Sequence, residues 1–470
     1  MNADKPKLLI PVELQVRELE PKLLLACVAA KRGFSVLVGP RREMHFYIPS
    51  FPKSIYLSKS ITSGSEHVFE NLCRLGHKIA VWDEEALVSL PPDIYYNHRL
   101  SSVALRYVSQ MFAWGHENAK LWMNYPKLPA DIPIHITGNP RGDLLRPELR
   151  EFYAKDTEQL RETYGNFILI NTNFNSVNAF YADMGLLNPS NNSEEEHTLS
   201  RRSRSMGLSL EYASGFYHYK RGIFKDFQQL IPDLEAFFPK NTIIVRPHPA
   251  ENQEIYHKIA EKCERVRVIN KGNVVPWLLA AKILIHNGCT TGVEAYALGT
   301  PAIAYRARVH EQYDRDFHQL PNDLSHECFS FEELQATIGK ILVGKLGVVN
   351  GGKSKRLFDH HLSAQEGPFA SERIMDVLVK LLEDESEVPG PALEDRLRSW
   401  VWATRRRLKK RIRGHLPNMS HNRPAFLRHR YPEISIENIS QRISQFQQLL
   451  GHQKELKIQK VANHFFEIRK

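Results

Sequence analysis

The sequence contains few cysteines and no long apolar run. Among its 470 residues are only five cysteines, and no pair is spaced as Cys-x-x-Cys. This excludes a disulfide framework and argues against a structural zinc site. No run of about 18 apolar residues occurs, so no transmembrane helix is expected. The first residues, MNADKPKLLIPVEL, lack the apolar stretch of a signal peptide. These absences predict a cytoplasmic protein.

Net positive charge is also small outside one segment. The net charge is +10, and residues 396–413 hold nine lysines or arginines and no acidic residue. The rest of the chain is therefore close to neutral. Hydrophobic residues make up 42% and charged residues 25%, as in an ordinary globular protein. The length predicts about three domains, or two and an appendage.

Short apolar runs alternate with helical patterns in two successive blocks. Expected strands cover residues 7–12, 34–38, 77–82, 109–114 and 134–137, then 167–171, 242–246, 267–269, 283–286 and 302–305. This alternation is typical of parallel βαβ units. It predicts an α/β fold with two Rossmann-like domains facing a cleft, with ligands at the carboxyl ends of the strands. The expected segments are an N-terminal domain (1–150), a second domain (151–345), a closing loop and helix (346–390) and a basic, helical C-terminal extension (391–470).

The second block carries a histidine between two prolines. Arg246 ends the expected strand 242–246, and Pro247, His248 and Pro249 follow it. The prolines restrict the backbone and prevent a helix there. A fixed imidazole beside an arginine suits a phosphate group or a departing nucleotide, and a purely structural histidine is the alternative.

A second motif in this block joins a strand to a helix. Thr290 and Thr291 come at the expected start of a helix that follows the strand 283–286. Helix N-termini bind anions through unpaired N–H groups, and two hydroxyl groups add donors. Glu294, one turn further, could accept hydrogen bonds from a ribose. The alternative is an ordinary helix cap completed by Glu294.

Acidic residues follow a strand of the first block. Asp83, Glu84 and Glu85 come after the expected strand 77–82. Carboxylates that crowd together repel, so we expect the pKa of one of them to rise and that group to act as a base. An acidic helix N-terminus is the alternative. Arg141 and Asp143 lie in a turn at the end of this block, where they either link the domains or contact substrate.

Taken as a set, these motifs resemble those of bacterial two-Rossmann (GT-B) glycosyltransferases that use CMP-activated sugars. The matching residues are Glu84-Glu85-Ala86, His248-Pro249 and Thr290-Thr291, with Ala86 where the family usually has glycine. More closely, the chain is similar to surface carbohydrate biosynthesis proteins over residues 7–385. That similarity rests on the stretches Arg17-Glu18-Leu19, Asp83-Glu84-Glu85, Gly138-Asn139-Pro140-Arg141, Arg246-Pro247-His248-Pro249 and Cys289-Thr290-Thr291-Gly292.

The resemblance implies a role for each matching residue. Glu84 would deprotonate an acceptor hydroxyl, with Glu85 beside it. His248 and Pro249 would contact the leaving CMP, Thr290 and Thr291 its phosphate and Glu294 its ribose, while Arg246 would neutralise phosphate charge. The donor would be a CMP-linked ulosonic acid. No metal or other cofactor is expected, because these donors serve the leaving group.

The basic segment 393–416 places apolar residues at helical spacing among its cations. Such a helix suits the anionic inner face of a membrane, where lipid-linked acceptors lie. Packing on its own protein and, less favoured, nucleic-acid binding are the alternatives. For the whole chain, the alternatives to a CMP-sugar glycosyltransferase are a CDP-glycerol-type polyol-phosphate transferase and a non-catalytic scaffold that binds nucleotide or docks on a membrane.

Overall fold

The computed structural model describes all residues except 1–5, 89, 189–196, 315–318 and 384–389. The chain forms two compact units. Unit 1 comprises Met1–Ala86, Arg99–Phe152 and Asp359–Lys470, and unit 2 comprises Leu87–His98 and Tyr153–Phe358.

Unit 1 is built on an eight-stranded sheet in the order β15-β16-β2-β1-β3-β4-β5-β6. Strands β1 to β6 are parallel, and each ends at the same edge of the sheet. Their side chains are mostly buried on both faces, as expected of a parallel sheet covered by helices. The strands are β1 Lys7–Val12, β2 Ser35–Pro40, β3 Ile55–Ser58, β4 Lys78–Val81, β5 Gln110–Ala113, β6 Ile134–Ile136, β15 Lys457–Ala462 and β16 Phe465–Arg469.

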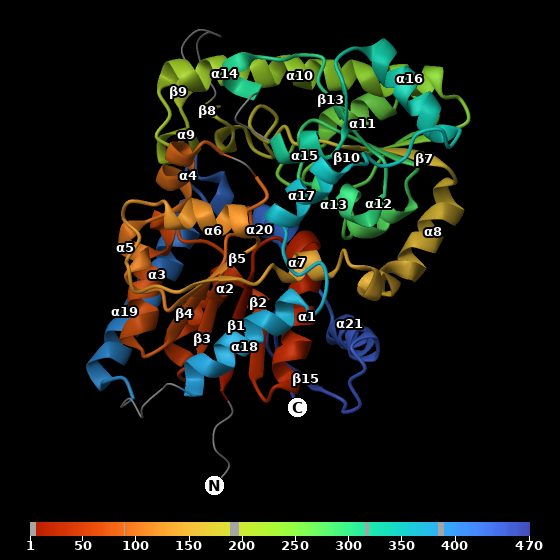
Figure 1. Ribbon diagram of the computed structural model, residues 1–470. Helices are drawn as coiled ribbons and strands as arrows, with labels where there is room; N and C mark the ends of the chain where they lie inside the picture. Colours follow the sequence, from red (N-terminus) through yellow and green to blue (C-terminus); the bar gives the residue numbers. More distant parts are fainter. Residues whose placement is uncertain (1–5, 89, 189–196, 315–318, 384–389) are drawn as a thin grey trace. The chain divides into compact units, whose positions relative to one another are not determined.

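The C-terminal residues belong to unit 1 and do not form a separate extension. β16 pairs antiparallel with β2, and its Phe466 and Ile468 are fully buried. In Figure 1 the blue C-terminal elements accordingly lie among the red and orange ones of this unit. The helices are α1 Gln15–Lys31, α2 Arg41–Tyr47, α3 Glu66–Arg74, α5 Ser102–Leu105, α6 His116–Met123, α7 Pro140–Asp143, α18 Ala370–Glu383, α19 Leu393–Arg413, α20 Pro424–Arg430 and α21 Ile436–Leu449.

Unit 2 has a six-stranded parallel sheet in the order β11-β10-β7-β12-β13-β14. Its strands are β7 Phe167–Asn171, β10 Thr242–Arg246, β11 Val266–Val268, β12 Ile283–His286, β13 Ala302–Tyr305 and β14 His326–Cys328, and β8 Leu187–Asn188 pairs with β9 Thr198–Leu199. The helices are α8 Ala154–Tyr164, α9 Arg201–Ser205, α10 Leu210–Phe237, α11 Glu254–Ala260, α12 Val275–Ala280, α13 Thr291–Leu298, α14 Glu311–Asp314, α15 Gln319–Asp323 and α16 Phe331–Leu342, while α4 Pro92–Arg99 and α17 Gly352–His361 cross the unit boundaries.

The predicted α/β class with two Rossmann-like domains is confirmed. The domain bounds differ, because residues 359–470 return to the first unit after the second is complete. Within the described part of the chain, no helix is long and apolar enough to cross a membrane.

Candidate functional site

In unit 2 the sequence motifs collect at the carboxyl edge of one sheet. β10 and β12 flank β7, and Asn171 is the register partner of both Arg246 and His286. The residues that follow these three strands therefore leave the sheet side by side. They include His248 after β10 and the segment from Asn287 to Thr290 after β12. Neighbouring strand ends of this kind form the usual ligand edge of an open α/β sheet.

The ring of His248 is fixed by its own turn. Its Nδ1 accepts a hydrogen bond from the N–H of Ala250 at 3.1 Å. A nitrogen that accepts carries no proton, so the neutral ring has its proton on Nε2. The tautomer is thus set for donation from Nε2.

Glu251 supports the His248 turn, and our sequence analysis missed it. This fully buried carboxylate accepts from the backbone N–H of His248 at 3.0 Å and from Thr172 Oγ1 at 2.9 Å. Its other oxygen accepts from the hydroxyl of Tyr256 at 2.6 Å. Burial raises the pKa of Glu251, and these hydrogen bonds oppose that rise. An acidic residue three positions after a Pro-His-Pro turn was the available signal.

His286 organises the turn between β12 and α13. Its Nδ1 accepts from the N–H of Gly288 at 3.1 Å, and its Nε2 is paired with Ser325 Oγ at 2.8 Å. Gly288 has a φ of +82°, which a side chain would disfavour. A Cβ on Gly292 would lie 2.7 Å from His286 Nε2, so glycine is needed for α13 to approach the strand.

The start of α13 presents the predicted threonines, and two asparagines join them at this edge. Thr290 is the N-cap and Thr291 the first helical residue, and Thr291 Oγ1 is buried without a hydrogen-bond partner among the described residues. Asn171 has both side-chain polar atoms buried and unsatisfied there, and Asn287 has its Oδ1 in the same state. Buried polar groups without partners are rare in folded proteins, so they point to a polar ligand. The sequence signal was an asparagine at or just after the end of each of two apolar strands.

Glu294 and Pro249 lie beside these groups, whereas Arg246 turns to other partners. Glu294 is buried in the first turn of α13, and Pro249 closes the His248 turn. The guanidinium of Arg246 donates to the carbonyl oxygens of Lys271, at 2.9 Å, and Gly272, at 3.0 Å, and stacks over Trp277. Burial lowers the pKa of Arg246 to about 9. Arg246 thus binds the loop after β11. We had expected it to contact a phosphate instead.

In unit 1 the predicted acidic residues follow β4, but they are held by other groups of the unit. Glu84 is 2% exposed, and its Oε2 accepts from Trp82 Nε1 at 2.9 Å. Glu85 is ion-paired with Arg17. Although burial alone would raise the pKa of Glu85, Arg17 and Arg99 hold it well below its usual range. The expected pKa rise is therefore reversed at Glu85.

The turn after Glu84 and Glu85 does not need the glycine that the resemblance led us to expect. Ala86 donates its N–H to the carbonyl oxygen of Asp83 at 3.3 Å, and its φ is not positive. Alanine therefore forms this turn without backbone strain.

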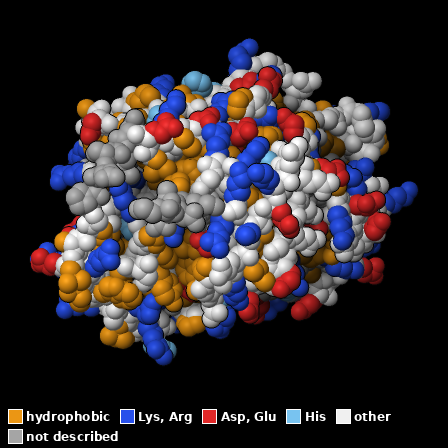
Figure 2. Space-filling view, turned by 90° about the horizontal axis from the view of Figure 1, so that it is seen from below, with side chains coloured by type: hydrophobic (Ala, Val, Ile, Leu, Met, Phe, Trp, Pro, Cys, Tyr) orange, Lys and Arg blue, Asp and Glu red, His pale blue; other side chains and the backbone are white. Residues whose placement is uncertain are grey.

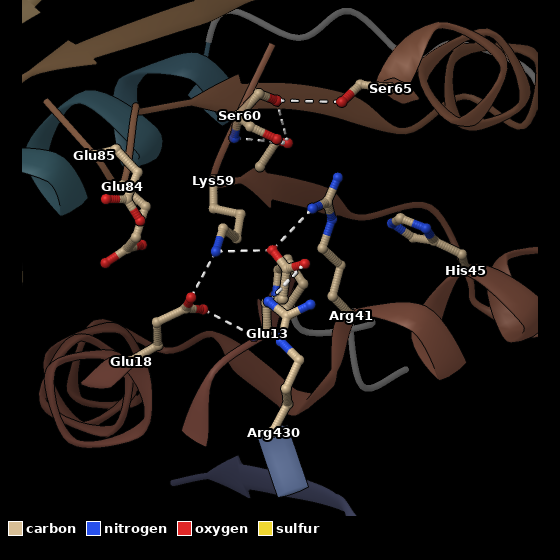
Figure 3. Close-up of polar contacts among 12 residues, drawn as sticks. Glu13, Glu18, Arg41, His45, Lys59, Ser60, Ser65, Glu84, Glu85 and Arg430 are labelled. Atoms are coloured by element: carbon tan, nitrogen blue, oxygen red, sulfur yellow. Dashed lines mark hydrogen bonds and ion pairs between the residues drawn. The ribbon is translucent and has the colours of Figure 1, made fainter. Parts of the chain in front are cut away.

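These carboxylates belong to a charged network along the carboxyl edge of unit 1 (Figure 3). Glu18 on α1 is fully buried and accepts from Lys22 Nζ at 2.7 Å and from Lys59 Nζ at 2.5 Å. Burial would raise the pKa of Glu18, but the two lysines hold it well below its usual range. Lys22 also lies 3.7 Å from Glu84, which connects the predicted base to this network.

Glu13, directly after β1, is the second centre of this network. It pairs with Lys59 and Arg430, each at 2.9 Å, and with Arg41 at 3.1 Å. Figure 3 shows Glu13 between these three cations. Burial opposes the effect, but Arg430, Lys59 and Arg41 hold the pKa of Glu13 well below its ordinary value.

Asp143 and Arg141 are buried within unit 1. Asp143 accepts from the N–H groups of Ala370, at 2.7 Å, and Ser371, at 2.9 Å, and so caps α18. Burial raises the pKa of Asp143 to about 6. Arg141 lies over the ring of Trp114. These contacts favour the structural interpretation of this turn over the substrate one.

Comparisons with known proteins show only distant resemblance. No protein-family model and no curated protein matches the chain. Among solved structures, the UDP-GlcNAc 2-epimerase of Methanocaldococcus jannaschii is 10% identical, covering 80% of this chain and 99% of that one with a TM-score of 0.48. The Neisseria meningitidis UDP-GlcNAc 2-epimerase is 12% identical, covering 80% and 100% with a TM-score of 0.47. The wall teichoic acid polymerase TagF is 12% identical, covering 82% and 90% with a TM-score of 0.49. Identities this low say nothing about the substrate.

Proposed function

We propose that the protein is a transferase of surface glycan biosynthesis that binds a cytidine-nucleotide-activated donor at the carboxyl edge of unit 2. The favoured donor is a CMP-linked ulosonic acid, received by a glycan or glycolipid acceptor. The observation that carries the nucleotide proposal is the set of unsatisfied polar groups at this edge, beside a histidine of fixed tautomer. The cytidine and the sugar come from the motif resemblance alone.

The polar groups of this edge suit a phosphate that departs with negative charge. The N–H groups at the start of α13 and the hydroxyls of Thr290 and Thr291 would bind its oxygens. Nε2–H of His248 would donate to the same phosphate, and Asn171 and Asn287 would bind polar atoms of the nucleotide. These donors meet the developing charge, so the proposal assigns no metal or cofactor to the reaction.

Glu84 stays the proposed base, and Glu85 its neighbour. Because Arg17 holds the pKa of Glu85 low, Glu85 is a weak base. We expect Glu84→Gln to lower turnover by about 10²–10⁴-fold with unchanged CMP affinity. Wild-type turnover in Glu84→Gln would remove the assignment, and loss of activity with loss of folding, seen by circular dichroism, would mark a structural role.

Ligand-induced stabilisation tests the nucleotide. We expect CMP and CMP-sugars to stabilise the protein, by about 2.7 kcal/mol at 100 times Kd. The double variant Thr290→Val/Thr291→Val should lose most of this effect. Thr163→Val, an exposed hydroxyl on α8, is the matched control. Stabilisation by CDP-glycerol but by neither CMP nor CMP-sugars would replace the proposal with a polyol-phosphate transferase. No response to any cytidine nucleotide would reject both.

We also propose that α19 contacts an anionic membrane surface. Ser399 and Ala403 are buried on one side of this helix, which packs on α2. The opposite side exposes apolar residues, each 46–74% accessible: Leu393, Leu397, Trp400, Val401, Leu408, Ile412 and, just after the helix, Leu416. Figure 2 shows hydrophobic side chains gathered beside lysine and arginine side chains on the face seen from below. Apolar residues bordered by cations are typical of helices that lie in a membrane interface.

Removing the C-terminal residues with α19 would also remove β16, which is part of the unit 1 sheet. Point variants therefore test the membrane contact better than truncation. We expect Leu397→Ser/Leu408→Ser to reduce binding to vesicles of phosphatidylcholine with phosphatidylglycerol. Phe237→Ser, an exposed apolar residue on α10, is the control. Equal binding by the Leu397→Ser/Leu408→Ser variant and the wild type would place the membrane contact elsewhere.

A further inference from the structure

Unit 1 contains a cavity of about 330 Å³ that the proposed function does not use. It opens where β1 and β2 end, at Glu13 and Arg41. Its other walls come from the C-terminal part of the chain, with Arg406 and Lys410 on α19 and Arg430 on α20. Segments that are distant in the sequence thus build one chamber, and its volume suits a small-molecule group.

The walls of this cavity carry an excess of positive charge. Among the described residues that line it, six are lysine or arginine and two are glutamate. Glu13 already accepts from three cations, two of which, Arg41 and Arg430, also line the cavity. Burial raises the pKa of the second carboxylate, Glu43, and the nearby His464, Arg42 and Arg407 oppose that rise.

The cations also repel one another. Burial and the nearby Arg41 and Arg42 lower the pKa of Arg406. Burial, Arg41 and Arg406 likewise hold the pKa of His45 well below its usual range, and the ring pairs with Tyr56 at 2.8 Å. Like charges brought together in a chamber destabilise the unliganded protein. An anion placed between them would relieve this repulsion.

We propose that this cavity binds the phosphoryl group of a small molecule or lipid headgroup, with Arg41, Arg406 and Lys410 as its contacts. A phosphoryl group carries more than one negative charge, which suits several converging cations. The planar guanidinium also matches phosphate oxygens in a bidentate geometry. The site lies in unit 1 and shares no residue with the proposed nucleotide site, so it does not depend on the proposed function.

Two neighbouring pairs on α19 provide a matched test. Arg406 and Lys410 line the cavity, whereas Arg405 and Lys409 are exposed and do not. Changing either pair to glutamine removes the same charge from the same helix. We expect Arg406→Gln/Lys410→Gln to weaken binding of pyrophosphate to the full-length protein about tenfold or more by titration calorimetry. Arg405→Gln/Lys409→Gln should change it less than twofold.

Stability without ligand gives a second measurement. Because the lining cations repel, Arg406→Gln/Lys410→Gln should unfold at a higher temperature than the exposed pair variant when no phosphate is present, and should gain less from added pyrophosphate. A lower unfolding temperature together with unchanged pyrophosphate affinity would assign these cations a structural role and overturn the proposal. Wild-type protein that fails to bind pyrophosphate at millimolar concentration would overturn it as well.

The source of the phosphoryl group is separated by two probes. Glycerol 3-phosphate tests a soluble ligand, and a short-chain phosphatidic acid kept monomeric in solution tests a headgroup without offering α19 a membrane surface. In either case, weaker binding by the lining variant than by the exposed one supports the site, and equal binding of both variants to both probes contradicts it. Arg406→Gln/Lys410→Gln should bind CMP as the wild type does, because neither residue belongs to the proposed nucleotide site. If CMP binding followed Arg406 and Lys410 instead of Thr290 and Thr291, the proposed nucleotide site would fail and the cationic cavity would remain.

Discussion

The two units carry different kinds of side chain at the carboxyl edge of their parallel sheets. In unit 1 a charged residue follows each of the first four strands: Glu13, Arg41, Lys59 and, after Trp82 and Asp83, Glu84. In unit 2 the corresponding edge presents asparagines and threonines, and its charged residues Arg246 and Glu251 are held by neutral hydrogen-bond partners, so we call it the neutral edge. A charged edge is stable only while its charges balance, whereas a neutral edge can keep unsatisfied groups ready for a ligand at a lower energetic cost. The difference predicts where each unit is sensitive to substitution.

The largest expected effect is on the charge balance of unit 1. Glu18→Gln would leave the buried Lys22 without its hydrogen-bonded counter-charge and Lys59 with Glu13 alone, and breaking a buried pair destabilises by about 3–5 kcal/mol. The control is Glu254→Gln, which breaks another pair with a lysine four residues later, Lys258, with both side chains 66% exposed. Exposed pairs contribute about 0–1 kcal/mol. Urea unfolding of both variants measures the difference, and equal losses would contradict a charge-balanced edge.

The charged network also shows where sequence reasoning stopped. The strands Lys7–Val12, Phe167–Asn171, Thr242–Arg246, Ile283–His286 and Ala302–Tyr305 were predicted with the bounds that the structure has. They are continuous apolar runs, which local pattern identifies. β3 was not predicted, because its four residues are too few to show a clear apolar run. The β15–β16 hairpin was also missed, since its pairing with β2 joins segments more than 400 residues apart.

The candidate site likewise contains residues that the sequence could predict and residues that it could not. The placement of His248, Thr290 and Thr291 at one sheet edge follows from strand order and could be predicted. Glu251 and Asn171 had only a positional signal in the sequence, and the burial and hydrogen bonding that set them apart needed coordinates. For the basic segment 393–416, the helix could be predicted from the spacing of its apolar residues. The cavity that Arg406 and Lys410 line could not, because its other walls come from α2 and α20.

The neutral edge of unit 2 should respond to acid through His286. Burial lowers the pKa of His286 to about 3, whereas unfolded histidine titrates near 6.5. Between these values the unfolded state binds more protons, so the stabilising effect is complete above about pH 6.5 and is lost as the pH falls toward 3. Between pH 6.5 and 5 the loss amounts to about 2 kcal/mol.

The variant His286→Asn isolates this contribution. Asparagine keeps an acceptor near the position of Nδ1 but does not titrate, so the pH dependence of its unfolding should be flatter than that of the wild type. His45 and His77 of unit 1 also have lowered pKa values and are present in both proteins, so they cancel in the comparison. Parallel curves for the two proteins would mean that His286 has the same pKa in the folded and the unfolded state.

The smallest expected effect tests how closely α13 packs on the strand that carries His286. In Gly292→Ala, the new Cβ would lie 2.7 Å from Nε2 of a ring that Gly288 and Ser325 hold in place. The helix must therefore move, at about 1–3 kcal/mol of stability. Gly339→Ala in α16 is the control, because its Cβ would meet no atom within 4 Å. It should stabilise by about 0.4–1 kcal/mol.

Because α13 carries the proposed phosphate donors, Gly292→Ala should also weaken CMP binding while Gly339→Ala leaves it unchanged. If both glycines behaved alike in unfolding and in CMP titration, the close fit of α13 would contribute nothing to a preorganised neutral edge.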